Sequence, residues 1–163
     1  MPQSVRPAVA ADAAALAAVQ RAAYLALLGA DVPALAAALD PAVLAATWRN
    51  AIELATPGSP YAVFAALDRT DHVVGFAAIG PLTDPDARPG ATELVALWVH
   101  PDHQRDGHGS RLLAAVADAV RSRPAPSPAA VRSLGLPLTP SSPPAAWAGA
   151  ARHPNQPPAP TSP

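Results

Sequence analysis

Apolar and polar positions along the first 123 residues alternate between a helical period and a strand period. Apolar residues recur at helical spacing in three segments, which predicts helices at 12–28, 41–56 and 107–122. Short runs rich in Val, Phe and Ile predict strands at 3–8, 61–67, 72–80 and 91–99. The order of one strand, two helices, three strands and a helix indicates an α/β or α+β layer structure.

Capping residues and apolar stripes refine these elements. Asp12 is the expected N-cap of the first helix, Gly29 its stop, and Asp40-Pro41 the start of the second helix. The sequence "DRTD" at 68–71 suits a hairpin turn. The residues expected to face the core are Leu16, Val19, Tyr24, Leu27 and Leu28 in the first helix, Val43, Leu44, Trp48 and Ile52 in the second, and Leu112, Leu113, Val116 and Val120 in the third.

Composition narrows the classes of function. The chain has 163 residues, enough for one domain, and its net charge of −1 gives no electrostatic case for nucleic acid or an anionic membrane. It has no cysteine, and therefore neither a disulfide framework nor a thiolate metal site. The N-terminus lacks the pattern of a signal peptide, and Gln20 and Arg21 interrupt the longest apolar run. We expect a cytoplasmic protein without nucleic-acid or membrane partners.

The character of the sequence changes after Arg123. Residues 124–163 hold more than half of the 22 prolines and show no regular period. Proline cannot donate to a β-ladder and favours polyproline II or irregular backbone. We therefore expect a folded domain at 1–123 and a disordered Pro/Ala-rich tail at 124–163.

The segment "QRDGHG" places a glycine turn directly before a helix. The first amides of a helix have no internal partner and the helix dipole favours negative charge there, so a phosphate or pyrophosphate is the natural guest. Arg105 and Arg111 would add charge-assisted contacts. The third small residue of a dinucleotide fingerprint is missing, and no Walker A lysine is present.

The spacing of "LWV", then "HPDH", then "QRDGHG" resembles motif A of the GNAT superfamily of acetyl-CoA-dependent N-acetyltransferases, with Gln104, Gly107 and Gly109 at the motif positions. The resemblance covers roughly residues 3–123. It implies that strand residues bind the pantetheine arm of acetyl-CoA and that the loop binds its pyrophosphate. The implied contact residues are Leu97, Trp98, Val99, Gln104, Arg105, Asp106, Gly107, His108, Gly109, Ser110 and Arg111.

Glu93 is the candidate catalytic residue. It lies four positions before Leu97, where some members of the superfamily carry a glutamate that acts as general base. An ammonium must lose a proton before its nitrogen can attack a thioester, and a carboxylate can accept that proton. The resemblance also implies that the amide of Val99 or a neighbour stabilises the oxyanion. The alternative is that Glu93 is a solvent-facing strand residue.

Other notable residues are interpreted as structural. His100 and His103 flank a proline loop with no third ligand evident, so no metal site is expected. The side chain of His108 is assigned no role of its own, and Trp48 and Trp98 are expected to be core anchors.

A GNAT fold continues after motif A with a fifth strand, which the sequence does not show. The tail is either an extension of a minimal or partner-completed domain, part of a degenerate GNAT, or an out-of-frame translation of a GC-rich gene, the interpretation we favour. The leading function is N-acetyltransfer to a primary amine on a small molecule or peptide by direct attack in a ternary complex. The alternative is a non-catalytic acyl-CoA-binding or interaction module. An unpaired strand edge would favour a homo-oligomer.

Overall fold

The computed structural model describes residues 4–28, 39–86 and 90–123, and its element order follows the prediction. The elements are β1 (Ser4–Pro7), η1 (Ala10–Asp12), α1 (Ala13–Leu28), α3 (Pro41–Leu54), β2 (Ala62–Leu67), β3 (Val73–Pro81), β4 (Thr92–Val99), η2 (Pro101–His103) and α4 (His108–Arg121). The expected α+β layer structure is confirmed. The expected helix stop at Gly29 and the expected tail at 124–163 lie outside the described residues.

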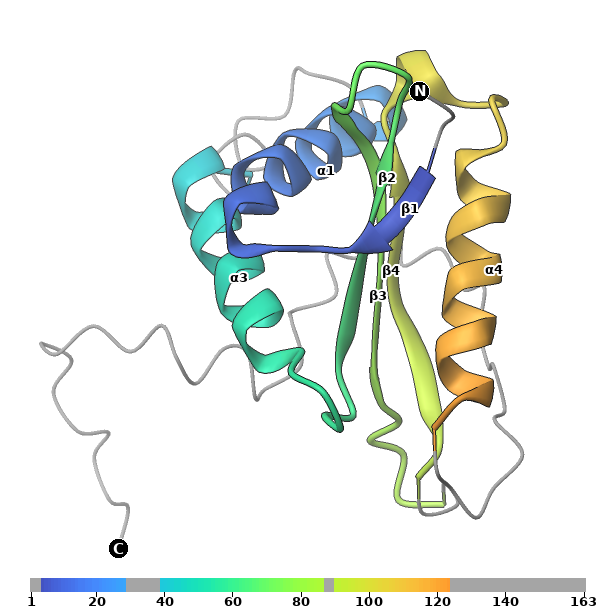
Figure 1. Ribbon diagram of the computed structural model, residues 1–163. Helices are drawn as coiled ribbons and strands as arrows, with labels where there is room; N and C mark the ends of the chain where they lie inside the picture. The colour runs from blue at the N-terminus through green and yellow to red at the C-terminus, as the bar shows by residue number, and fades with distance from the viewer. Residues whose placement is uncertain (1–3, 29–38, 87–89, 124–163) are drawn as a thin grey trace, which may run out of the picture.

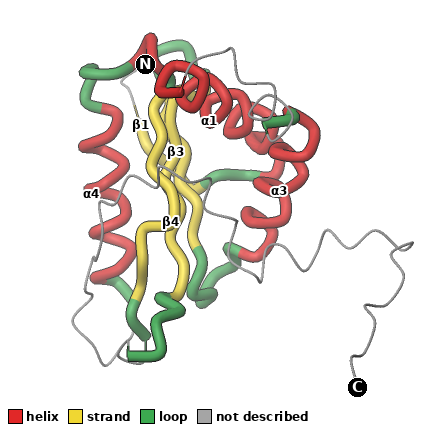
Figure 2. The backbone as a smooth tube through the Cα atoms, turned by 180° about the vertical axis from the view of Figure 1, so that it is seen from behind, coloured by secondary structure: helices red, strands yellow, loops and turns green. Residues whose placement is uncertain are grey.

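The four strands form one sheet in the order β1-β2-β3-β4, and every neighbouring pair is antiparallel. Helices α1 and α3 cover one face of this sheet and α4 covers the other (Figures 1 and 2). Each face has its own apolar cluster, built around Leu16, Trp48 and Phe76 under α1 and α3, and around Ile79 and Leu112 under α4. The sheet is thus the middle layer of three.

The apolar stripes are only partly as expected. Leu16, Val19 and Tyr24 are buried, but Leu27 is 51% exposed and Leu28 is 41% exposed. The last turn of α1 keeps the predicted helical period, yet little of the described chain covers it.

In the second helix, Trp48 and Ile52 are buried as expected, whereas Val43 is 62% exposed. At 3.6 residues per turn, Val43 points about 140° away from Trp48, so both cannot face the same core.

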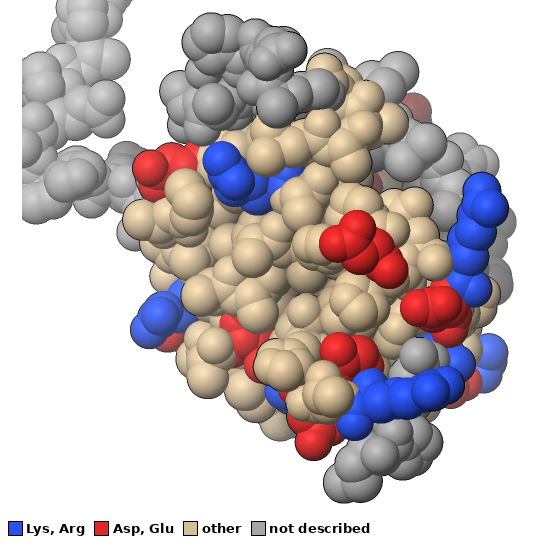
Figure 3. Space-filling view, turned by 90° about the horizontal axis from the view of Figure 1, so that it is seen from above, with Lys and Arg blue, Asp and Glu red and all other residues tan. Residues whose placement is uncertain are grey.

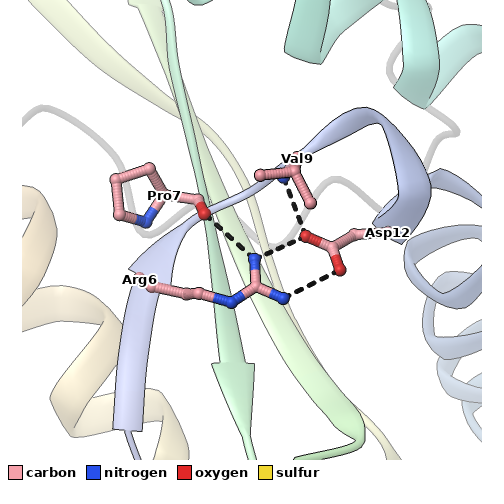
Figure 4. A network of polar contacts seen from close by, with 4 residues as sticks. All are labelled: Arg6, Pro7, Val9 and Asp12. Carbon is pink, nitrogen blue, oxygen red and sulfur yellow. Dashed lines mark hydrogen bonds and ion pairs between the residues drawn. The ribbon is translucent and has the colours of Figure 1, made fainter.

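Asp12 is not the N-cap of α1, because a turn of 3-10 helix precedes it. Its carboxylate accepts hydrogen bonds from the Val9 amide at 2.8 Å and from the Arg6 guanidinium at 2.7 and 3.0 Å (Figure 4). Burial raises the pKa of Asp12, but the hydrogen bonds from Arg6 and Val9 and the charge of Arg6 outweigh it and lower the pKa overall. This ion pair ties β1 to the start of the first helix.

The segment Ala10–Leu28 is the one stretch of the described chain that is long and apolar enough to cross a bilayer, with 19 residues and a mean hydropathy of 1.3. A core helix satisfies the same criteria. Here Ala13 and Leu16 are fully buried, and the helix packs on β3, β4 and α3. Its packing is therefore that of a core helix.

Replacing Asp12 with asparagine is expected to lower the free energy of unfolding by about 2 kcal/mol at pH 7, because a part-buried charge-assisted pair with Arg6 is lost. The folded-state pKa of Asp12 is lowered, so its contribution is complete above the ordinary value of 3.8 and disappears as the pH falls through the folded-state pKa. Urea unfolding of the unmutated protein and of Asp12→Asn, at pH 7 and at lower pH, measures this contribution to the free energy of unfolding.

The matched control is Asp118→Asn, which breaks the exposed pair between Asp118 and Arg121 and should change stability by less than about 1 kcal/mol. A stability difference between Asp12→Asn and the unmutated protein that stays constant as the pH falls would contradict the assigned role of the carboxylate.

Candidate functional site

The outer edge of β4 has no neighbouring strand among the described residues. The amide of His100 donates to the carbonyl of Val74 at 2.8 Å, which sets the alternation of backbone groups along this pair of strands. Trp98, two residues earlier, therefore directs its amide and carbonyl toward β3, while Leu97 and Val99 direct theirs to the open edge. Of the three strand residues expected to contact the ligand, Leu97 and Val99 therefore present backbone groups at the open edge, and Trp98 does not.

A β-bulge lies near the start of β4. The register passes from Ala78 opposite Ala96 to Ile79 opposite Leu94, so Val95 has no partner on β3. Val95 and Ala96 both pack toward the cluster under α1 and α3, as two successive residues of a bulge can.

Glu93 is half-buried on the face of the sheet that carries α1 and α3. It pairs with Gly80, and a Cβ atom on Gly80 would lie 3.2 Å from the ring of Tyr61 and 3.5 Å from Val95. Tyr61 and Val95 both belong to the apolar cluster of that face. Glu93 is thus a β4 residue opposite the glycine that packs under Tyr61, about 20 Å along the strand from Val99 at ~3.3 Å per residue.

The loop between β4 and α4 borders an open cavity of about 300 Å³. Its lining residues are Val99, His103, Gln104, Arg105, Gly107, His108, Gly109 and Ser110. Gly107 is the N-cap of α4 with φ of 80°, and no side chain caps the helix. Arg105 also has a positive φ, of 68°, which is costly for a residue with a side chain. The first amides of α4 therefore point into a preformed hollow at the positive end of the helix dipole.

Arg111 stabilises this loop from the first turn of α4. Its Nη1 donates to the carbonyl of Asp106 at 3.1 Å, and its guanidinium lies beside Gly107. Basic and acidic side chains are interspersed at this end of the molecule (Figure 3). An anion would therefore be held by local amides and single arginines rather than by a broad positive field.

His108 is the feature of the site that the sequence did not reveal. Its side chain is 1% exposed, and neither ring nitrogen has a hydrogen-bond partner among the described residues. Burial lowers the pKa of His108, as do the nearby Arg111 and His103, while Asp106 raises it. An unpartnered buried polar group costs about 1–3 kcal/mol.

The donor atoms of His103, Asp106 and His108 lie within 4.8 Å of one another. His100, which was considered together with His103, is not part of this cluster. The sequence did not indicate the grouping of His103 with Asp106 and His108, because the spacing of residues 103, 106 and 108 does not match a familiar metal motif.

Trp48 and Trp98 lie on the face opposite α4. Trp48 packs edge-on against Phe76, with 4.6 Å between the ring centroids, and is 5% exposed, so it is a core anchor as expected. Trp98 is half-buried and packs against Tyr24 at 4.7 Å. Its indole therefore contacts α1 and not the open edge.

This geometry defines an α+β layer protein in which a free strand edge leads to a cavity at an uncapped helix N-terminus. Residues 31–130, more than half of the chain, match the family model described as "Acetyltransferase (GNAT) family". The chain belongs to this family. No curated protein is a significant match to the sequence.

Several solved structures share the fold. The PaiA N-acetyltransferase of Thermoplasma acidophilum, solved with coenzyme A, is similar over 74% of this chain and 73% of its own, with 16% identity and a TM-score of 0.58. A GNAT family acetyltransferase of Brucella melitensis, solved with acetyl-CoA, is similar over 74% and 69%, with 21% identity and a TM-score of 0.54. The ribosomal-protein-alanine N-acetyltransferase of the same organism is similar over 72% and 67%, with 25% identity and a TM-score of 0.54.

Replacing Gly107 with alanine is expected to weaken the binding of inorganic pyrophosphate about tenfold, because left-handed backbone costs an alanine about 1–2 kcal/mol and the loop relaxes away from its binding geometry. Gly58→Ala is the control, since Gly58 has φ of 83° and lies outside the loop; an added Cβ meets nothing within 4 Å there, and at Gly107 only the Arg111 guanidinium at an ordinary contact distance of 3.5 Å.

Both glycine variants should lose similar stability in urea unfolding, and only Gly107→Ala should lose affinity in a calorimetric titration. Equal pyrophosphate affinities of the two variants would contradict the assignment of the loop as the anion site.

Proposed function

We propose that the chain transfers the acetyl group of acetyl-CoA to a primary amine by direct attack in a ternary complex. The observation that carries this proposal is the continuity of the free edge of β4 with the cavity at the start of α4. A ligand with amide groups along an extended arm and a pyrophosphate at one end matches both parts at once. Pantetheine and the pyrophosphate of coenzyme A have this form.

The donor would bind with its pyrophosphate on the amides of residues 104–109 and its arm along the backbone of Leu97 and Val99. Arg105 is exposed at the rim and Arg111 lies beneath the loop, so both can add charge to the phosphate site. The thioester would then lie further along β4, toward Glu93. The free edge supports this direction, because it continues from the cavity along the strand.

Glu93 would act as the general base. It accepts a proton from the acceptor ammonium, and the free amine then attacks the thioester carbonyl to give a tetrahedral oxyanion. The oxyanion collapses, the carbon–sulfur bond breaks, and the coenzyme A thiolate takes up the proton that the attacking nitrogen still has to lose to become the amide. The oxyanion would form near the bulge at Val95, two residues from Glu93, where the backbone departs from the regular register with β3.

The catalytic unit would be residues 1–123, with a small-molecule or peptide amine as acceptor in the cytoplasm. The face with Glu93 and Tyr61 supports an acceptor site on the side of α1 and α3. The open edge of β4 also supports association of two copies of the chain.

Replacing Glu93 with glutamine is expected to lower turnover about 10²- to 10⁴-fold and to leave the affinity for acetyl-CoA unchanged, because only the proton acceptor is removed. Coenzyme A release should be measured against a panel of primary amines and peptides with free N-termini, and donor affinity by calorimetry. Glu53→Gln is the matched control, since Glu53 is exposed on α3 and is the other glutamate of the chain; it should change neither quantity.

Full turnover by Glu93→Gln would exclude the glutamate as base. Binding of acetyl-CoA by the unmutated chain without turnover of any amine would support the alternative, a non-catalytic acyl-CoA-binding module.

A further inference from the structure

Three potential metal ligands converge at the turn before α4. His103 ends η2, Asp106 lies in the turn, and His108 is the first residue of the helix. Their donor atoms lie within 4.8 Å of one another. The rings of His103 and His108 are 6.3 Å apart and nearly perpendicular, at 76°. The donor atoms of two imidazoles and one carboxylate therefore lie in one small cluster.

The buried histidine makes this cluster more than a chance gathering of surface groups. His108 is 1% exposed and neither of its ring nitrogens has a partner among the described residues. Histidine in such a place is ordinarily hydrogen-bonded, because desolvating a polar group without a partner is unfavourable. Coordination of a cation by one nitrogen would supply the missing partner.

We propose that His103, Asp106 and His108 bind a divalent cation of the zinc class. Two histidine nitrogens and one carboxylate oxygen are a donor set that zinc accepts, with a fourth position left open. In a tetrahedral site with bonds of about 2.0–2.1 Å, donor atoms lie about 3.3 Å apart. Since the donor atoms lie within 4.8 Å of one another, the cluster must contract by at most about 1.5 Å to bind the ion in this way.

The two ligands that would have to move toward the ion, His103 and Asp106, are less buried than His108. Asp106 is exposed and His103 is half-buried, while His108 is fixed in the core of the loop. His103 and His108 also line the cavity at the helix start. The open coordination position would thus border the same cavity, and this site goes beyond the proposed acetyl transfer, since it requires no donor or acceptor to be bound.

The test is a calorimetric titration of zinc chloride into the full chain, free of affinity tags and treated with chelator, in the absence of acetyl-CoA. The expected result is saturable binding of one ion per chain. His103→Gln and Asp106→Asn should each weaken this binding by at least about tenfold. Neither substitution alters the buried histidine, so both variants should keep the melting temperature of the unmutated protein without zinc.

His72→Gln is the matched control, because His72 is an exposed histidine of the β2–β3 hairpin that is not part of the cluster. It should bind zinc like the unmutated chain, and zinc should raise the melting temperature of both but not that of Asp106→Asn. Zinc binding that survives both cluster substitutions, or that is lost in His72→Gln, would overturn the proposal, as would no binding to the unmutated chain.

Discussion

The unpaired outer edge of β4 is the constraint on which the site depends. Along β3, the inner residues are buried on both sides, whereas nearly all of β4 is half-buried. Backbone amides and carbonyls at such an edge need partners, and the alternation set by His100 leaves those of Leu97 and Val99 without a strand among the described residues. An edge of this kind either pairs with another chain or binds an extended ligand.

The loop that follows β4 makes the second alternative specific. Its two residues of positive φ turn the chain sharply enough to start α4 beside the strand end, so that the helix amides and the strand edge face the same cavity. The hydrogen bond from Arg111 to the Asp106 carbonyl holds this turn. The same turn brings together His103, Asp106 and His108, so one piece of backbone geometry underlies both the proposed anion site and the proposed metal site.

Most of the architecture could be predicted because it follows from local periodicity. The strands, the order of the elements and the glycine turn before the last helix are all visible in short windows of sequence, and the resemblance to motif A is local too. The features that the sequence did not predict correctly depend on contacts beyond short windows of sequence. Asp12 resembles an N-cap in the sequence, but its carboxylate instead accepts hydrogen bonds from Arg6 on β1 and from the Val9 amide. The bulge at Val95 depends on the register with β3, which no pattern within β4 reveals. The burial of His108 depends on how the loop folds over it, and a lone histidine between two glycines carries no such signal.

A calorimetric titration of acetyl-CoA into the full chain tests the central claim, that the edge of β4 and the start of α4 form one donor site. Circular dichroism and a cooperative melting transition should first establish that the sample is folded. The account predicts saturable binding of one acetyl-CoA per chain, weakened about tenfold by Gly107→Ala and unchanged by Gly58→Ala. The absence of binding by a folded sample would contradict it.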